Sequence, residues 1–205
     1  MRILITAGGT REYIDPVRFI SNASSGRMGY ALVRAALRAG HKVILVTAPT
    51  TQRLPSGAKV VEAETAARMF EAVKKNFEMC DCLIMAAAVS DYTPARTAIT
   101  KIKKSNKSLT LRLKPTADIL KWAGKHKRKN QIVVGFALED KNLRQNAEIK
   151  LKEKNLDMII ANTTDVIGDG RSTVQIKTPD RKWLKLQRAS KTVIAQKIIS
   201  LVQTV

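Results

Sequence analysis

Short apolar stretches rich in β-branched residues alternate along the chain with segments whose apolar residues recur at helical spacing. Residues 2–7, 42–47 and 83–88 form such stretches, which are typical of strands buried on both faces of a parallel sheet. Residues 27–39 and 65–77 carry an apolar stripe along one face and predict two amphipathic helices. This alternation is typical of βαβ units and therefore predicts an α/β protein.

The second half of the chain repeats the alternation and then changes character. Residues 132–137 and 157–161 predict two further strands, with a helix over 141–154 between them. Beyond Asn162, residues 173–177 and 182–186 alternate in polarity around Thr178-Pro179-Asp180, which predicts a β-hairpin, and a helix is expected from Ser190.

The predicted elements combine into one architecture. The expected fold class is α/β, with a Rossmann-like, mainly parallel sheet, helices on both faces and an appended C-terminal β-hairpin. Because no long linker interrupts the pattern, we expect one domain over residues 1–205. Its core should lie in residues 1–162, and the hairpin and last helix in residues 163–205.

Composition narrows the possible classes of protein. The 205 residues are 44% hydrophobic, which is typical of a globular protein and not of a disordered one. The longest apolar run, residues 82–89, is far shorter than the roughly 20 residues of a membrane helix, so we expect no membrane association. The cysteines are Cys80 and Cys82 and the histidines are His41 and His126, too few for a disulfide framework or a zinc site. With no signal peptide at its start, the chain is expected in the cytoplasm.

The chain is strongly basic, with a net charge of +20 from 37 Lys and Arg against 17 Asp and Glu. Such a charge favours anionic partners, among them nucleic acids and polyphosphates. A basic nucleic-acid-binding module is therefore one alternative function. Aromatic residues that could stack on bases amount to only 4% of the chain, so we expect no nucleic-acid partner.

A glycine pair and a small-residue turn follow the first predicted strand. Gly8-Gly9 and the turn at Ser24-Ser25-Gly26 before the next helix suggest an anion at the helix N-terminus, although a serine could simply cap the helix. No G-x-G-x-x-G follows the strand, and no acidic residue follows Val46, so the alternative of a Rossmann-type oxidoreductase lacks its two usual signals. A P-loop is also absent.

Five ordered motifs together are specific to one family. They are Gly8-Gly9-Thr10 through Asp15-Pro16-Val17-Arg18 to Asn22-x-Ser24-Ser25-Gly26-x-Met28-Gly29, then Ala86-Ala87-Ala88-Val89-Ser90-Asp91-Tyr92, Lys101-Ile102-Lys103-Lys104, Val134-Gly135-Phe136-Ala137-x-Glu139, and Lys150-x3-Lys154-x2-Asp157-x3-Ala161-Asn162. The chain resembles phosphopantothenate–cysteine ligase (phosphopantothenoylcysteine synthetase), in its stand-alone bacterial-type form.

The resemblance implies a two-step ligation in coenzyme A biosynthesis. The carboxylate of 4′-phosphopantothenate attacks the α-phosphate of CTP and releases pyrophosphate, and the amine of L-cysteine then displaces CMP from the acyl-cytidylate. Eukaryotic relatives use ATP, and Ala117 and Leu138 depart from the family pattern on the nucleotide side, so ATP stays an alternative. The resemblance further implies Mg²⁺ bridging the phosphates, no flavin, a homodimer, and a separate decarboxylase that acts next.

The resemblance also assigns roles to residues of the first and third motifs. Asn22 is expected to be catalytic in amide formation, and Lys101 in the activation step, from a Lys-rich mobile loop. Arg18 suits the substrate phosphate, bidentately and across the dimer interface. The expected substrate-binding residues are Gly9, Arg18, Asn22, Ser24 and Ala88.

A second set of residues is expected to bind the nucleotide. Lys150 and Lys154 are four residues apart on the predicted helix, so both could reach one polyphosphate, although a solvated basic face is the simpler interpretation. Phe136 could stack on the base or simply belong to the core. The whole expected set is Ala86, Ala87, Asp91, Lys101, Asp118, Ile119, Phe136, Lys150 and Lys154.

Overall fold

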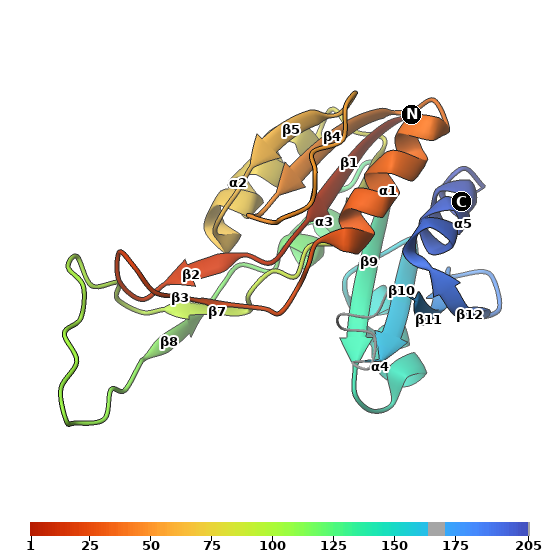
Figure 1. Ribbon diagram of the computed structural model, residues 1–205. Coiled ribbons are helices and arrows are strands. Elements are labelled where there is room, and N and C mark those ends of the chain that lie inside the picture. The colour runs from red at the N-terminus through yellow and green to blue at the C-terminus, as the bar shows by residue number, and fades with distance from the viewer. Residues whose placement is uncertain (164–170, 205) are drawn as a thin grey trace.

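A central sheet organises the protein (Figure 1). The computed structural model describes residues 1–163 and 171–204, and over these residues the sheet has eight strands in the order β12-β11-β10-β9-β6-β1-β4-β5. The strands are β1 (Arg2–Ala7), β4 (Lys42–Thr47), β5 (Lys59–Glu62), β6 (Cys82–Met85), β9 (Ile132–Glu139), β10 (Met158–Thr163), β11 (Arg171–Lys177) and β12 (Leu184–Ser190).

Six neighbouring strands, from β10 to β5, are parallel, and β11 and β12 add an antiparallel hairpin at one edge. The predicted fold class is therefore confirmed. Several strand ends differ from the prediction. The strand β6 stops at Met85, short of the predicted residue 88, whereas β9 and β12 extend past their predicted ends to Glu139 and Ser190. The apolar run continues past β6 because Ala86 and Ala87 pack against the two cores.

Helices cover both faces of the sheet. One core lies between the sheet and α1 (Arg27–Arg38) with α5 (Lys191–Val202), and it buries Tyr30 and Ile198 completely. The opposite core lies under α2 (Ala66–Phe77), α3 (Ile119–His126) and α4 (Leu143–Glu153), and it buries Met69 and the cysteine Cys80. None of the described helices combines the length and the hydropathy needed to cross a bilayer.

Glycine sets how closely α1 approaches the central strand. A Cβ added at Gly29 would lie 2.5 Å from the Cβ of Ala7, so a larger residue would push the helix away from β1. The helix ends as predicted at Gly40, which adopts a φ of 78° that most residues avoid. The close approach at Gly29 fixes the N-terminal part of α1 beside the carboxyl end of β1.

Two small antiparallel ribbons project from the carboxyl edge of the sheet (Figure 1). The first pairs β2 (Arg11–Tyr13) with β3 (Phe19–Ser21), and we call residues 11–21 the first arm. The second pairs β7 (Tyr92–Pro94) with β8 (Leu113–Pro115), and we call residues 92–115 the second arm. The long loop at its tip, residues 95–112, is called the flap. Neither arm was predicted from the sequence.

Candidate active site

The loops that follow β1 and β6 join at the carboxyl edge of the sheet. Gly9 and Ala88 form a parallel bridge, in which the N–H of Ala88 donates to the carbonyl of Gly8 at 2.8 Å and that of Thr10 to the carbonyl of Ala88 at 3.3 Å. The N–H of Ser90 also donates to Oγ1 of Thr10 at 2.9 Å. Open α/β sheets bind ligands at this edge, where the chain connections diverge.

Asn22 lies against these joined loops. Its Nδ2 donates to the carbonyls of Ala88 and Val89 at 3.4 and 3.2 Å. A Cβ at Gly9 would lie only 2.8 Å from the backbone oxygen of Asn22, so the close approach requires glycine. The N–H of Ser24 donates to the same backbone oxygen at 2.7 Å. The structure thus brings together Gly9, Asn22, Ser24 and Ala88, four of the predicted substrate-binding residues.

The alternative interpretation of the serine turn, as a simple helix cap, does not fit the structure. The N-cap of α1 is Gly26, with a φ of 72°, and no side chain caps the helix. The hydroxyl of Ser24 instead accepts a long hydrogen bond from the N–H of Gly26 at 3.4 Å. The turn therefore keeps the first N–H groups of α1 directed toward the loop after β1.

An open pocket of about 180 Å³ lies beside Asn22 on the same edge. Because Val89 lines this pocket and also accepts the hydrogen bond from Asn22, the two sites are continuous. Six of the nine predicted nucleotide-binding residues lie in its lining. They are Ala87, Asp91, Asp118, Ile119, Phe136 and Lys154, and the sequence missed the other lining residues Met85, Val89, Thr116, Ala117 and Leu120.

Phe136 belongs partly to the core and also borders the pocket. It is half-buried against the core under α1 and is one of the residues that line the pocket. The neighbouring Gly135 lets α3 approach, because a Cβ there would lie 2.7 Å from Leu120. An aromatic side chain fixed in the wall of an open pocket can stack on a planar base.

Two charged residues close one end of the pocket. Asp118 is the N-cap of α3, where its side chain accepts from the N–H of Lys121 at 2.9 Å, and it forms an ion pair with Lys154 at 2.8 Å. Burial, the largest single influence, would raise the pKa of Asp118, but the hydrogen bonds from Lys154 and from the N–H of Lys121, together with the charges of both lysines, outweigh it and the pKa is lowered. Gly124 makes this pairing possible, since a Cβ there would meet the backbone oxygen of Lys154 at 1.8 Å.

Lys154 directly follows the end of α4 at Glu153, and its N–H donates to the carbonyl of Lys150 at 3.1 Å, so the predicted four-residue helical spacing is present. Lys150 forms an ion pair with Glu139 at 2.5 Å and is absent from the pocket lining, as is the predicted residue Ala86. The two ammonium groups are therefore held by carboxylates on different elements.

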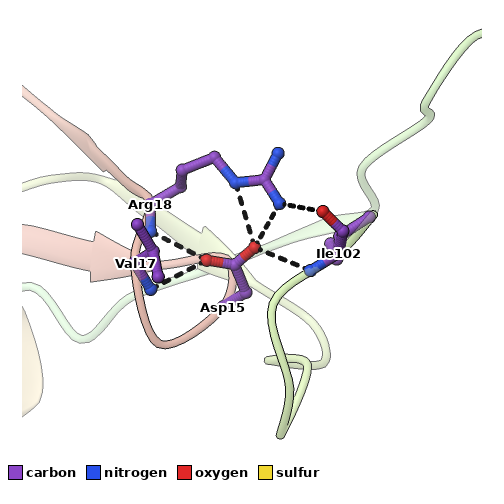
Figure 2. A network of polar contacts seen from close by, with 4 residues as sticks. All are labelled: Asp15, Val17, Arg18 and Ile102. Atoms are coloured by element: carbon purple, nitrogen blue, oxygen red, sulfur yellow. Dashed lines mark hydrogen bonds and ion pairs between the residues drawn. The ribbon is translucent and has the colours of Figure 1, made fainter. Parts of the chain in front are cut away.

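Arg18 and Lys101 lie on the arms (Figure 2). Nε and Nη2 of Arg18 donate to Oδ2 of Asp15 at 3.0 and 2.5 Å, and Nη2 also donates to the carbonyl of Ile102 at 2.6 Å. Lys101 is exposed at the start of the flap. Ile102 ties the start of this loop to the first arm.

Comparison with known proteins identifies the family. Residues 1–205 match the family described as DNA/pantothenate metabolism flavoprotein C-terminal domain. The chain belongs to this family. It is 47% identical over 169 residues to the coenzyme A biosynthesis bifunctional protein CoaBC of Bacillus subtilis (strain 168), which covers 82% of this chain and 41% of that protein.

Two further relatives support this family assignment. A crystal structure of the C-terminal domain of the bifunctional protein CoaBC superposes with a TM-score of 0.86 at 38% identity, over 99% of this chain and 94% of the other. A protein named cysteine/cysteine sulfinic acid decarboxylase, from an unknown prokaryotic organism, is 46% identical over 210 residues, or 98% of this chain and 58% of the relative. The chain spans about half the length of the curated relatives it matches.

The predicted resemblance to the phosphopantothenate–cysteine ligase family is confirmed. The motifs that carried it are far apart in the sequence, yet four contribute residues to the carboxyl edge of the sheet. The loops after β1 and β6 supply the first two motifs, β9 the fourth, and the end of α4 the fifth. The third motif lies on the flap, which reaches this edge through Asp15 and Arg18.

Proposed function

We propose that this protein is a ligase that joins 4′-phosphopantothenate to L-cysteine at the expense of CTP, in coenzyme A biosynthesis. One observation carries the proposal: Asn22 donates a hydrogen bond to the carbonyl of Val89, and Val89 lines the pocket assigned to the nucleotide. An acyl-cytidylate needs an acyl site next to a nucleotide site, and the contact of Asn22 with this pocket wall supports such an arrangement. Membership of the family and the names of its CoaBC relatives support the same reaction.

In the proposed activation step, a carboxylate oxygen of phosphopantothenate bonds to the α-phosphorus of CTP, and the bond to the β-phosphate breaks with release of pyrophosphate. Such transfers depend on positioning and on neutralising negative charge. Lys154 at the pocket and Lys101 on the flap are the cations that we assign to this step. Lys101 would stabilise the charge that develops at the α-phosphate when the flap covers the bound substrates.

In the second step, the amine of cysteine attacks the acyl carbon, CMP leaves, and the amine loses a proton. The contacts of Asn22 with Ala88 and Val89 are long enough to be exchanged for contacts with substrate. Its amide can then hydrogen-bond the acyl carbonyl as negative charge develops there. No electron is transferred in either step, so the proposed reaction uses no flavin.

Mg²⁺ would enter with the triphosphate. In residues 1–163 and 171–204, no three His, Cys, Asp or Glu side chains form a set that could hold a metal by themselves. Asp91 and Asp118 do line the pocket, and Mg²⁺ commonly combines one or two carboxylates with substrate phosphates and water. The residues therefore fit a metal shared with CTP, whose chemistry would be neutralisation of the phosphate charge.

We also propose that two copies of the chain pair through their arms. Large apolar side chains are exposed there, and Ile99 is 94% exposed. A second copy that covers them would bring one protomer's arm toward the site of the other. The exposed apolar residues of the arms are Val17, Phe19, Tyr92, Ile99, Leu109, Leu111 and Leu113. Sedimentation of the wild type and of a Val17→Ser, Ile99→Ser double variant tests the pairing, and a monomeric wild type would refute it.

The decisive experiment follows pyrophosphate release from CTP and from ATP, with phosphopantothenate and with or without cysteine. We expect release that requires phosphopantothenate and prefers CTP. A preference for ATP would support the proposed ligation but with ATP as the nucleotide in place of CTP. If pyrophosphate is released from neither nucleotide, the proposed function is wrong. We place the reaction in the cytoplasm, ahead of a separate decarboxylase that acts on the product.

A further inference from the structure

Asp15 is one of the residues through which the first arm contacts the second (Figure 2). Its side chain is 0% exposed. Oδ1 accepts from the N–H groups of Val17 and Arg18 at 2.9 and 2.8 Å. Oδ2 accepts from Nε and Nη2 of Arg18 at 3.0 and 2.5 Å and from the N–H of Ile102 at 3.1 Å. We call these four residues the Asp15 network.

The carboxylate of Asp15 is held in its charged form. Burial alone would raise its pKa, but the hydrogen bonds from Arg18 and from the N–H groups of Val17, Arg18 and Ile102 outweigh burial and hold the pKa well below its usual range. All of its recorded donors belong to the protein, and the side chain has no surface left for a substrate. Asp15 therefore acts through the residues it contacts.

Those residues adjoin three side chains that we assign to binding and catalysis. Arg18 is itself part of the network, Asn22 follows four positions later at the end of β3, and Lys101 directly precedes Ile102. Beyond Ile102, residues 103–112 are all exposed, so nothing in this part of the flap is packed against the body. The last firm attachment of the flap before its exposed tip is the peptide group of Ile102.

We propose that Asp15 is a positioning residue. It fixes the start of the flap against the first arm and so holds Lys101 in a defined position relative to Asn22. The inference rests on the proposed function for the role of Lys101, but the attachment itself can be measured without any substrate. The network also orients Arg18. Because Nε and Nη2 are taken by Asp15, Nη1 is the nitrogen left to meet a substrate phosphate, so the expected bidentate contact is replaced by a single one.

The attachment can be tested by limited trypsin digestion, with the cleavage sites resolved by mass spectrometry. The bond after Lys101 belongs to the anchored peptide, whereas the bond after Lys107 lies in the exposed tip and serves as an internal reference. In Asp15→Asn, cleavage after Lys101 relative to Lys107 should rise at least about tenfold, since local opening governs proteolysis.

Glu64→Gln is the matched control. Glu64 also holds the first arm by a carboxylate, through the hydroxyl of Tyr13 at 2.6 Å and an ion pair with Arg11, but it has no recorded contact with the flap. Its cleavage ratio should stay within about twofold of the wild type. Should Asp15→Asn fail to fold, Asp15→Ser is the second variant, because a serine hydroxyl can still accept from the turn N–H groups but does not reach Ile102.

The second readout is the activation step at saturating CTP and phosphopantothenate. Asp15→Asn should slow pyrophosphate release at least about tenfold while the KM for CTP changes less than about threefold, because the pocket is left intact. If the ratio of cleavage after Lys101 to cleavage after Lys107 is unchanged in Asp15→Asn, the proposed attachment is wrong. If the ratio rises but pyrophosphate release stays normal, the positioning role is wrong. A raised ratio in a protein whose wild type releases no pyrophosphate supports the attachment and refutes the proposed function instead.

Discussion

The carboxyl edge of the sheet and the two arms contribute to the same site but are stabilised differently. The pocket residues Ala87, Ile119 and Phe136 pack against the two apolar cores. The arms are joined to each other by polar contacts, such as the N–H of Ala98 to the carbonyl of Ile14 at 2.9 Å and Oγ1 of Thr97 to that of Tyr13 at 3.1 Å. Seven of the thirteen exposed large apolar residues in the described chain lie on the arms.

This contrast suggests different roles for the two regions, with nucleotide binding at the pocket and control of the chemical steps by the arms. A pocket built on the core is formed before any ligand arrives, because moving its walls would disrupt close packing. The arms bury little apolar surface, so their position depends on a few hydrogen bonds and on whatever covers them. Mutations at the sheet edge should therefore change stability and nucleotide affinity, whereas mutations on the arms should change individual chemical steps.

The largest effect is expected for Asn22→Asp, directly after the first arm. The substitution removes the two N–H donors that now contact Ala88 and Val89 and places a carboxylate beside the reacting acyl group. Amide formation should fall at least about 100-fold while pyrophosphate release continues, so that the acyl-cytidylate accumulates. Quenched-flow sampling with mass spectrometry checks this, and normal amide formation would remove Asn22 from the second step.

Lys101→Gln tests the second arm, and we expect a somewhat smaller effect. Loss of the charge should slow activation by about 10- to 100-fold, since one cation of several is removed at the α-phosphate. Binding of CTP should change less than about threefold because Lys101 does not line the pocket. Titration of CTP measures binding, and single-turnover pyrophosphate release measures activation. A loss confined to CTP binding contradicts the role assigned to Lys101 in activation.

Gly124→Ala tests the sheet edge. A Cβ at this position would lie 1.8 Å from the backbone oxygen of Lys154, so α3 must move away from the end of α4. The free energy of unfolding should fall by about 1–3 kcal/mol, with weaker CTP binding and an unchanged trypsin pattern in the flap. Urea denaturation measures the loss. Lys125→Ala, at an exposed position of the same helix, is the control and should unfold at nearly the wild-type urea concentration.

The smallest effect concerns the ion pair of Asp118 with Lys154. Because the pKa of Asp118 is lower in the folded protein than in the unfolded chain, its contribution to stability is complete above the ordinary pKa of an aspartate, about 4, and is lost as the pH falls through the lowered pKa of the folded state. The pair is partly exposed, so we expect less than about 1 kcal/mol. Unfolding of Asp118→Asn and wild type should differ at pH 7 and converge once the pH is low enough to protonate Asp118 in the folded protein. A difference independent of pH would exclude the ion pair as its cause.

The difference between the core and the arms also explains which elements could be predicted from the sequence. Most strands and helices of the core were predicted because long apolar periods identify them, and β1 and β4 have the predicted bounds. The edge strand β5 was not predicted, because it has four residues and none of them is fully buried. The four arm strands are three residues each, too short to show a period, although Asp15-Pro16 is a turn signal. The contact of Asp15 with Ile102 joins positions 87 residues apart, which no local pattern reveals.

The site residues follow the same division. Six of the nine residues that the family motifs predicted for the nucleotide line the pocket. Core packing holds these motif residues in fixed relative positions. The ion pair of Lys150 was not foreseen, because helical spacing says nothing about the carboxylate of Glu139 on the neighbouring strand. The partners of Arg18 were missed for the same reason, since one of them belongs to a distant loop.

The burial of Cys80 and Cys82 has a consequence for a protein proposed to bind free cysteine. Burial raises the pKa of the Cys80 thiol to about 11, and that of Cys82 is raised as well. Attack on a disulfide requires a thiolate that cystine or a mixed disulfide can reach. Both thiols of the chain are buried and protonated at neutral pH, so this protein can bind a thiol substrate without becoming cross-linked to its oxidised form.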